Sequence, residues 1–127
     1  MIAVIFEIVP RSNAKEKYLA IAAELRPHLE KIDGLISVER FASLSQPEKL
    51  LSLSFWRDEA SVARWRRIAE HRDAQLAGRT EIFESYRLRV ASILRDYGMT
   101  DRAEAPGAGA SEGLRGGRGA PKKTPVR

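Results

Sequence analysis

The segment from Ile2 to Val9 constrains the fold most, because its apolar residues follow a strand pattern on both faces. One face holds Ile2, Val4, Phe6 and Ile8, and the other holds Ala3, Ile5, Glu7 and Val9. Only one of these eight residues is polar. A strand that is apolar on both faces is typical of a central strand with another layer packed on each side. The segment therefore predicts a sheet that is covered on both faces.

Two helices are expected, each between strands. Asn13 is the expected N-cap of the first, with Glu16 completing a capping box, and this helix is expected to end at Gly34. Pro27 is expected to bend it. Asp58 is the expected N-cap of the second helix, which ends near Gly78.

Three further strands complete the pattern. Leu35 to Leu44 and Lys49 to Trp56 are joined by a short turn that contains a proline, which predicts an antiparallel hairpin. The last strand is expected from Phe83 to Leu94. Its alternation places Tyr86, Leu88 and Val90 on one face and Arg87 and Arg89 on the other.

The order strand, helix, strand, strand, helix, strand predicts a ferredoxin-like α+β sandwich, with a four-stranded antiparallel sheet and both helices on one face. Two helices leave the second face of the sheet uncovered. That face is nevertheless expected to be apolar, because the first strand is apolar on both faces and the third strand adds Leu50 and Trp56 opposite Leu51, Leu53 and Phe55. We expect Ile5 and Leu50 to be hidden there. We therefore expect a homodimer in which two copies pack sheet against sheet.

Composition excludes several classes of site and location. The chain has no cysteine and two histidines, so we expect no metal site. It also lacks a dinucleotide-binding glycine motif and a phosphate-binding loop, and we expect no cofactor. No apolar run is long enough to cross a membrane, and the first residues lack the charge order of a secretory signal. We expect a cytoplasmic protein without membrane association.

The last residues differ in composition from the rest. Residues 100–127 contain six of the nine glycines and three of the six prolines, with no aromatic residue. We expect a folded domain at 1–98 and a disordered Gly/Pro/basic tail at 99–127. The domain is nearly neutral, which predicts no binding of nucleic acid by it. The tail is basic but lacks interleaved aromatics, so a solvated tail is expected there.

Four segments resemble the antibiotic biosynthesis monooxygenase family: IAVIFEIVP, IDGLISVERFASL, LLSLSFWRDEASVARWR and HRDAQLAGR. The most specific feature is the FW that ends the third strand, followed by a helix with a second tryptophan. The resemblance covers about residues 1–98. It implies a dimeric α/β barrel of the ferredoxin-like type. The family includes cofactor-free oxygenases of polyphenolic rings, quinol oxygenases, haem-degrading enzymes and small members without a known substrate.

The resemblance also implies positions for functional residues. Trp65 matches the helix tryptophan that lines the pocket of oxygenase-type members. Ser61 stands where some members have an amide side chain, and His71 lies near the position of a tyrosine. The catalytic asparagine and the haem-ligand histidine of the haem-degrading branch fall at Glu7 and near Gln75, so neither is present. This departure makes haem degradation the less favoured alternative.

The residues themselves leave alternatives open. Trp65 and Trp56 suit either core packing or a pocket wall. His71 suits a proton shuttle or the surface, and it lies about 120° around an ideal helix from Trp65, so both would face one cavity only if the helix broke between them. Glu7, on an apolar strand, is either a catalytic base or the partner of Arg87 and Arg89 in an ion pair.

We therefore expect a cofactor-independent monooxygenase acting on a small aromatic substrate, a phenol, quinol or polyketide-like ring. A base would deprotonate the substrate, and the anion would react with dioxygen. The candidate catalytic residues are His71, Glu7 and Trp65, and the candidate substrate-binding residues are Phe6, Phe55, Trp56, Ser61 and Arg87. The alternative is a non-catalytic dimeric ligand-binding or stress-response module. A cavity of ligand size that reaches Trp65 would favour binding over a filled scaffold.

Overall fold

The computed structural model describes residues 1–75 and 81–107, with the side chains of 71–75 left out. It contains every element that the sequence predicts, with most ends shifted by a few residues. The strands are β1 (Ile2–Pro10), β2 (Leu35–Ala42), β3 (Leu50–Trp56) and β4 (Phe83–Ser92). The helices are α1 (Lys15–Glu30) and α2 (Glu59–Gln75). Neither helix is long and apolar enough, over the described residues, to span a membrane.

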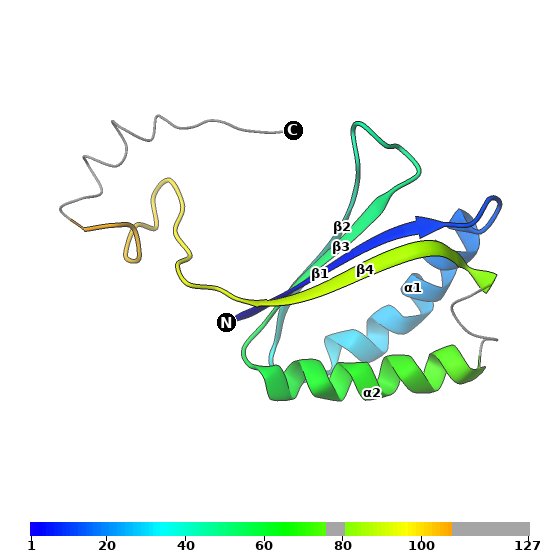
Figure 1. The fold of residues 1–127 in the computed structure, drawn as a ribbon. Coiled ribbons are helices and arrows are strands. Elements are labelled where there is room, and N and C mark those ends of the chain that lie inside the picture. The colour runs from blue at the N-terminus through cyan, green and yellow to red at the C-terminus, as the bar shows by residue number, and fades with distance from the viewer. Residues whose placement is uncertain (76–80, 108–127) are drawn as a thin grey trace. The chain divides into compact units, whose positions relative to one another are not determined.

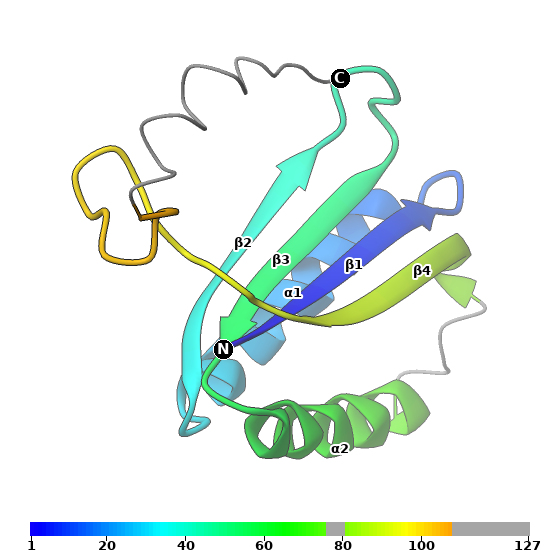
Figure 2. The same cartoon turned by 60° about the vertical axis from the view of Figure 1, so that its left-hand side comes forward.

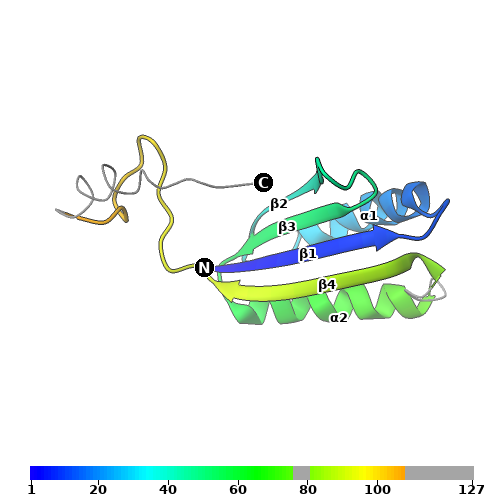
Figure 3. The same ribbon diagram turned by 45° about the horizontal axis from the view of Figure 1, so that its top comes forward.

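The four strands form one sheet in the order β2-β3-β1-β4, and every neighbouring pair is antiparallel (Figure 2). Both helices lie on the same side of this sheet (Figures 1 and 3). This arrangement confirms the predicted ferredoxin-like α+β fold. It places β1 in the interior of the sheet, as its apolar pattern on both faces requires.

The start of α1 differs from the prediction. Asn13 has a positive φ of 70°, and Ala14 stands at the N-cap without a side-chain hydrogen bond. The predicted capping box of Asn13 and Glu16 was therefore wrong. Asparagine is among the residues that best tolerate a positive φ, so Asn13 serves the turn after β1 instead of the helix start. α1 runs through Pro27 and ends at Glu30.

The hydrophobic core on the helix face is divided into two clusters at opposite ends of the sheet. One consists of Ile8, Ala14, Tyr18, Leu50 and Ile82. The other consists of Leu29, Trp56 and Val62, with Trp65 packed against it. The register joins Ile8 to Leu50 at one end and Ile2 to Trp56 at the other. The middle of the helix face therefore lies between two packed ends.

The opposite face of the sheet carries an apolar band. The register places Ile5 beside Leu53 and Ala3 beside Phe55. These residues alternate along their strands with residues of the helix-face core, so they lie on the face away from the helices. Phe41 on β2 lies opposite Leu51 and is 42% exposed. The sequence predicted an apolar face without a covering helix, and no helix of the described chain covers this band. The expectation that Leu50 lies on it beside Ile5 was wrong, because Leu50 is the register partner of Ile8 and packs in the core of the helix face.

The chain divides into two compact units, Met1–Ser92 and Ile93–Arg127. Of the second unit, the structure describes residues 93–107, which contain no helix or strand. Within them, the Gly98 N–H donates to the Asp101 carbonyl at 2.8 Å, and the Arg102 guanidinium lies 5.1 Å from the centre of the Tyr97 ring. The predicted disordered tail from 99 falls mostly on residues 108–127, outside the described part.

Candidate functional site

A cavity of about 400 Å³ lies between the helix face of the sheet and the two helices. α1 contributes Tyr18, Ala22, Leu25 and Leu29, and α2 contributes Val62, Trp65 and Ala69. The volume lies in the range of small-molecule sites, which are mostly apolar with a few placed polar groups. The cavity separates the two core clusters, and side chains from both of them line it.

The floor of the cavity consists of two rows of side chains across the sheet. In one row Val38, Ser54, Val4 and Val90 are register partners. In the other row Arg40, Ser52, Phe6 and Leu88 are register partners. Strand alternation therefore directs one side chain from every strand into each row.

Small side chains explain why this space is open. On β3, Ser52 and Ser54 stand between Leu50 and Trp56, where the alternation would otherwise place large apolar residues. Ala22 faces them from α1. The Trp56 indole N–H donates to the Ser54 hydroxyl at 2.8 Å, so the buried indole has its hydrogen-bond partner. Because these side chains are short, the space between the two core clusters stays open while the clusters themselves remain packed.

One end of the cavity is aromatic. The Phe6 ring centre lies 5.9 Å from that of Phe83 and 5.6 Å from that of Tyr86, both edge to face. Tyr18 continues the cluster, with its ring centre 5.7 Å from Phe83. Edge-to-face pairs of this kind hold rings in fixed orientations. They form a rigid wall at the end opposite Trp65.

A cation stands beside this wall, and sequence reasoning missed it. The Arg40 Nε donates to the Tyr18 hydroxyl at 3.4 Å, and its guanidinium carbon lies 5.9 Å from the centre of the Tyr18 ring. Both residues line the cavity, as do Ser52 and, from α2, Glu70. The polar groups of the cavity wall are few, and the rest of the lining is mostly apolar.

The structure brings together three of the predicted site residues. Phe6, Trp56 and Trp65 all line the cavity. Phe55, Glu7 and Arg87 lie instead on the opposite face of the sheet, because each alternates with a residue that faces the helices. Glu7 therefore does not share a cavity with Trp65.

Glu7 is engaged in ion pairs on that opposite face. Its carboxylate lies 3.2 Å from the Lys49 ammonium and 3.4 Å from the Arg89 guanidinium. The pair with Arg89 is the cross-strand contact that the sequence predicted. Arg87, its direct neighbour in register, makes no ion pair within the described residues. These contacts fit the ion-pair alternative for Glu7.

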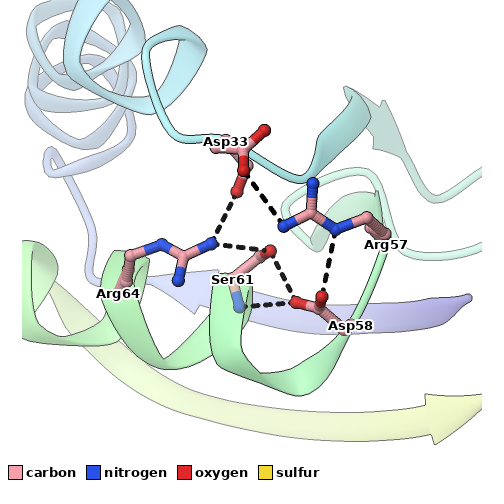
Figure 4. A network of polar contacts seen from close by, with 5 residues as sticks. All are labelled: Asp33, Arg57, Asp58, Ser61 and Arg64. Atoms are coloured by element: carbon pink, nitrogen blue, oxygen red, sulfur yellow. Dashed lines mark hydrogen bonds and ion pairs between the residues drawn. The ribbon is translucent and has the colours of Figure 1, made fainter.

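Ser61, another predicted binding residue, belongs to a polar network at the start of α2 (Figure 4). Asp58 caps the helix as predicted: its carboxylate accepts from the Ser61 N–H at 2.9 Å and from the Ser61 hydroxyl at 2.7 Å. These two hydrogen bonds hold the pKa of Asp58 well below its ordinary value. Ser61 is fully buried and does not line the cavity.

Two arginines join this network to the turn before β2. Arg57 lies 3.1 Å from the Asp33 carboxylate and 3.0 Å from that of Asp58. The hydrogen bond to Arg57 lowers the pKa of Asp33. Arg64 donates to the Asp33 carbonyl at 2.9 Å and to the Ser61 hydroxyl at 3.1 Å. The network fixes the start of the helix that carries Trp65.

His71 lies in α2, and its side chain falls outside the described residues. The helix is continuous from Glu59 to Gln75, so the break that would let His71 and Trp65 face one cavity is absent. Within the described residues, no group of three His, Cys, Asp or Glu side chains could hold a metal ion.

The sequence profile of the antibiotic biosynthesis monooxygenase family matches residues 1–77, more than half of the chain. The chain belongs to the antibiotic biosynthesis monooxygenase family. A relative from Pyricularia oryzae, named jasmonate monooxygenase ABM, is 52% identical over 93 residues, which are 73% of this chain. The match spans 43% of the length of that relative.

Solved structures of other proteins share the fold of this chain. The protein Rv0793 from Mycobacterium tuberculosis has a TM-score of 0.64 at 19% identity, covering 76% of this chain and 98% of its own. The protein SO0527 from Shewanella oneidensis has a TM-score of 0.62 at 20% identity, covering 71% of this chain and 87% of its own. At these identities the likeness shows the fold alone.

Proposed function

We propose that this member of the antibiotic biosynthesis monooxygenase family is an oxygenase domain that holds a small apolar substrate in the cavity between the sheet and the helices. The observation that carries the proposal is a cavity of about 400 Å³ between the two core clusters, with Trp65 in its lining. If side chains had filled the space between the sheet and the helices, a structural domain without a ligand would have been favoured. A ligand-binding module without chemistry has the same cavity, and turnover distinguishes the two.

Two substrate classes are supported. The first is an electron-rich ring, a phenol, quinol or polyketide-like compound, because the walls offer Phe6, Phe83 and Trp65 for stacking. The second is jasmonate, since the relative from Pyricularia oryzae is named for it. Both are apolar bodies of a size suited to the cavity.

The two classes need different electron supplies. An activated aromatic methylene gives four electrons to dioxygen: it loses its two hydrogens, one oxygen becomes the carbonyl and the other leaves as water. Hydroxylation at a saturated carbon of jasmonate uses only two substrate electrons, so a reductant such as NADPH must supply two more. In the first reaction a base removes the first proton, and Glu70 is the carboxylate that lines the cavity within the described residues.

We expect the purified chain to incorporate isotopically labelled dioxygen into at least one member of a panel that holds an anthrone, a naphthol and, with NADPH, jasmonate. Mass spectrometry of the product measures the incorporation. Loss of the base should lower anthrone turnover about 100-fold in Glu70→Gln. Glu59→Gln, an exposed change on the same helix, should leave it unchanged. A panel without any labelled product would contradict oxygenase activity and leave the non-catalytic module.

We also propose that a second copy of the chain covers the outer face of the sheet. The support is the apolar band around Ile5, Leu53 and Phe55, since a surface of this kind on a sheet is typical of an interface. The resemblance to dimeric α/β barrels agrees with it.

Sedimentation equilibrium at micromolar concentration should therefore give twice the chain mass. Leu53→Lys places a charge in the apolar band and should shift the mass to that of one chain. Leu19→Lys, on the exposed side of α1, is the matched control and should remain dimeric. A single-chain mass for the unmodified protein would refute the dimer.

A further inference from the structure

We propose that Arg40, with Tyr18 and Ser52, is an anion-binding site inside the cavity, and that the substrate carries a carboxylate on an apolar body. This inference rests on the proposed function, because it concerns the ligand of the same cavity. It starts from a cation on the wall of a mostly apolar cavity. Arg40 lines the cavity from the second half of β2 and is only partly exposed.

Arg40 has no carboxylate partner within the described residues. Its neighbour Glu39 points to the other face of the sheet, opposite Leu53. The described contacts of its guanidinium are one hydrogen bond through Nε and the stacking, both with Tyr18. The N–H donors of its two terminal nitrogens therefore have no partner within the described residues. A guanidinium that is partly withdrawn from water without a counter-charge is costly, and an anionic ligand would offset that cost.

Two hydroxyl groups stand beside these donors. The Tyr18 hydroxyl accepts from the Arg40 Nε, so its own hydrogen is left to donate, and Tyr18 is only 7% exposed. Ser52 is the register partner of Arg40 on the same face, which places their Cβ atoms about 5 Å apart. Its hydroxyl makes no hydrogen bond within the described residues. Arginine binds a carboxylate through two parallel N–H donors, and the hydroxyls add two more.

Among the described residues, the other charged side chains that line the cavity come from α2. Arg66 and Glu70 are both exposed to solvent there, which screens them. The site on the sheet therefore combines the cation of Arg40, the aromatic ring of Tyr18 and the short hydroxyl side chain of Ser52. A ligand would place its carboxylate at Arg40 and its apolar body toward Trp65.

Isothermal titration calorimetry with a matched pair of probes tests this assignment. The probes are 1-naphthaleneacetate and 1-naphthaleneacetamide, which share the ring and differ in the charge of the head group. We expect the full chain to bind the acetate about tenfold more tightly than the amide. Arg40→Gln should remove that preference and leave amide binding unchanged. Arg67→Gln, the same charge change at an exposed position outside the cavity, should keep the preference.

Equal binding of the two probes by the unmodified chain would overturn the assignment, and so would loss of the preference in Arg66→Gln instead of Arg40→Gln. Absence of binding by both probes, together with absence of turnover across the oxygenase panel, would overturn the proposed function as well. Turnover of uncharged panel members alone, with equal probe binding, would leave the oxygenase and remove only the anion site. These failures are therefore distinguishable.

Discussion

Ala22→Phe is expected to lower oxygenase turnover by about 100-fold or more while the protein remains folded. Ala22 is buried on α1 and lines the cavity opposite the serines of β3. A phenyl ring at this position projects into open space, so it fills the substrate volume without displacing either core cluster. The cost of overpacking should therefore be small. Substrate turnover and the midpoint of thermal unfolding measure the two effects separately.

Ala20→Phe is the matched control. It makes the same exchange on the same helix, at an exposed position outside the cavity lining, and should leave turnover unchanged. If Ala22→Phe fails to fold, Ala69→Phe introduces the ring from α2 instead. A folded Ala22→Phe variant with full activity would show that the reaction takes place elsewhere.

Gly34→Ala is expected to destabilise the fold by roughly 3 kcal/mol. Gly34 has a φ of +105°, which side-chain-bearing residues rarely adopt, and an added Cβ would collide with the Ser61 hydroxyl oxygen. Ser61 cannot move away easily because it is buried and bonded to Asp58 and Arg64. The alanine would therefore suffer both backbone strain from the positive φ and a collision of its Cβ with Ser61.

Equilibrium unfolding in urea measures this loss. Gly98→Ala is the control, since an added Cβ there has no atom within 4 Å, and it should change stability by less than about 0.5 kcal/mol. Combining Gly34→Ala with Ser61→Gly should recover part of the loss, because the colliding side chain is removed. Unfolding of Gly34→Ala at the urea concentration of the unmodified chain would contradict the steric argument.

The fold followed from alternation and helix signals in the sequence, because strand periodicity decides which side chains share a face. Tyr86, Leu88 and Val90 were correctly assigned to one face for that reason. The same rule separates Phe6 from Glu7, which are neighbours in one strand. Grouping Glu7 with Trp65 overlooked a signal that was present in the sequence.

Arg40 could not have been located from alternation alone. The pairing of β2 with β3 shifts between Leu35 and Ser37, so an irregularity there reverses which residues face the helices. Counting by twos from Leu35, whose partner is Trp56, would place Arg40 on the outer face. The residue that we assign to anion binding therefore depends on a bulge, which only the three-dimensional structure reveals.

The two serines of β3 bear on how domains of this kind diverge. Exchanging Ser52 and Ser54 for leucine and valine would leave register, topology and the outer face as they are, yet would close the space between the clusters. A receptor and an inert scaffold could thus differ at two alternate positions of one strand. Overall resemblance between family members is therefore a poor guide to whether they take up a small molecule, whereas the size of these two side chains is informative.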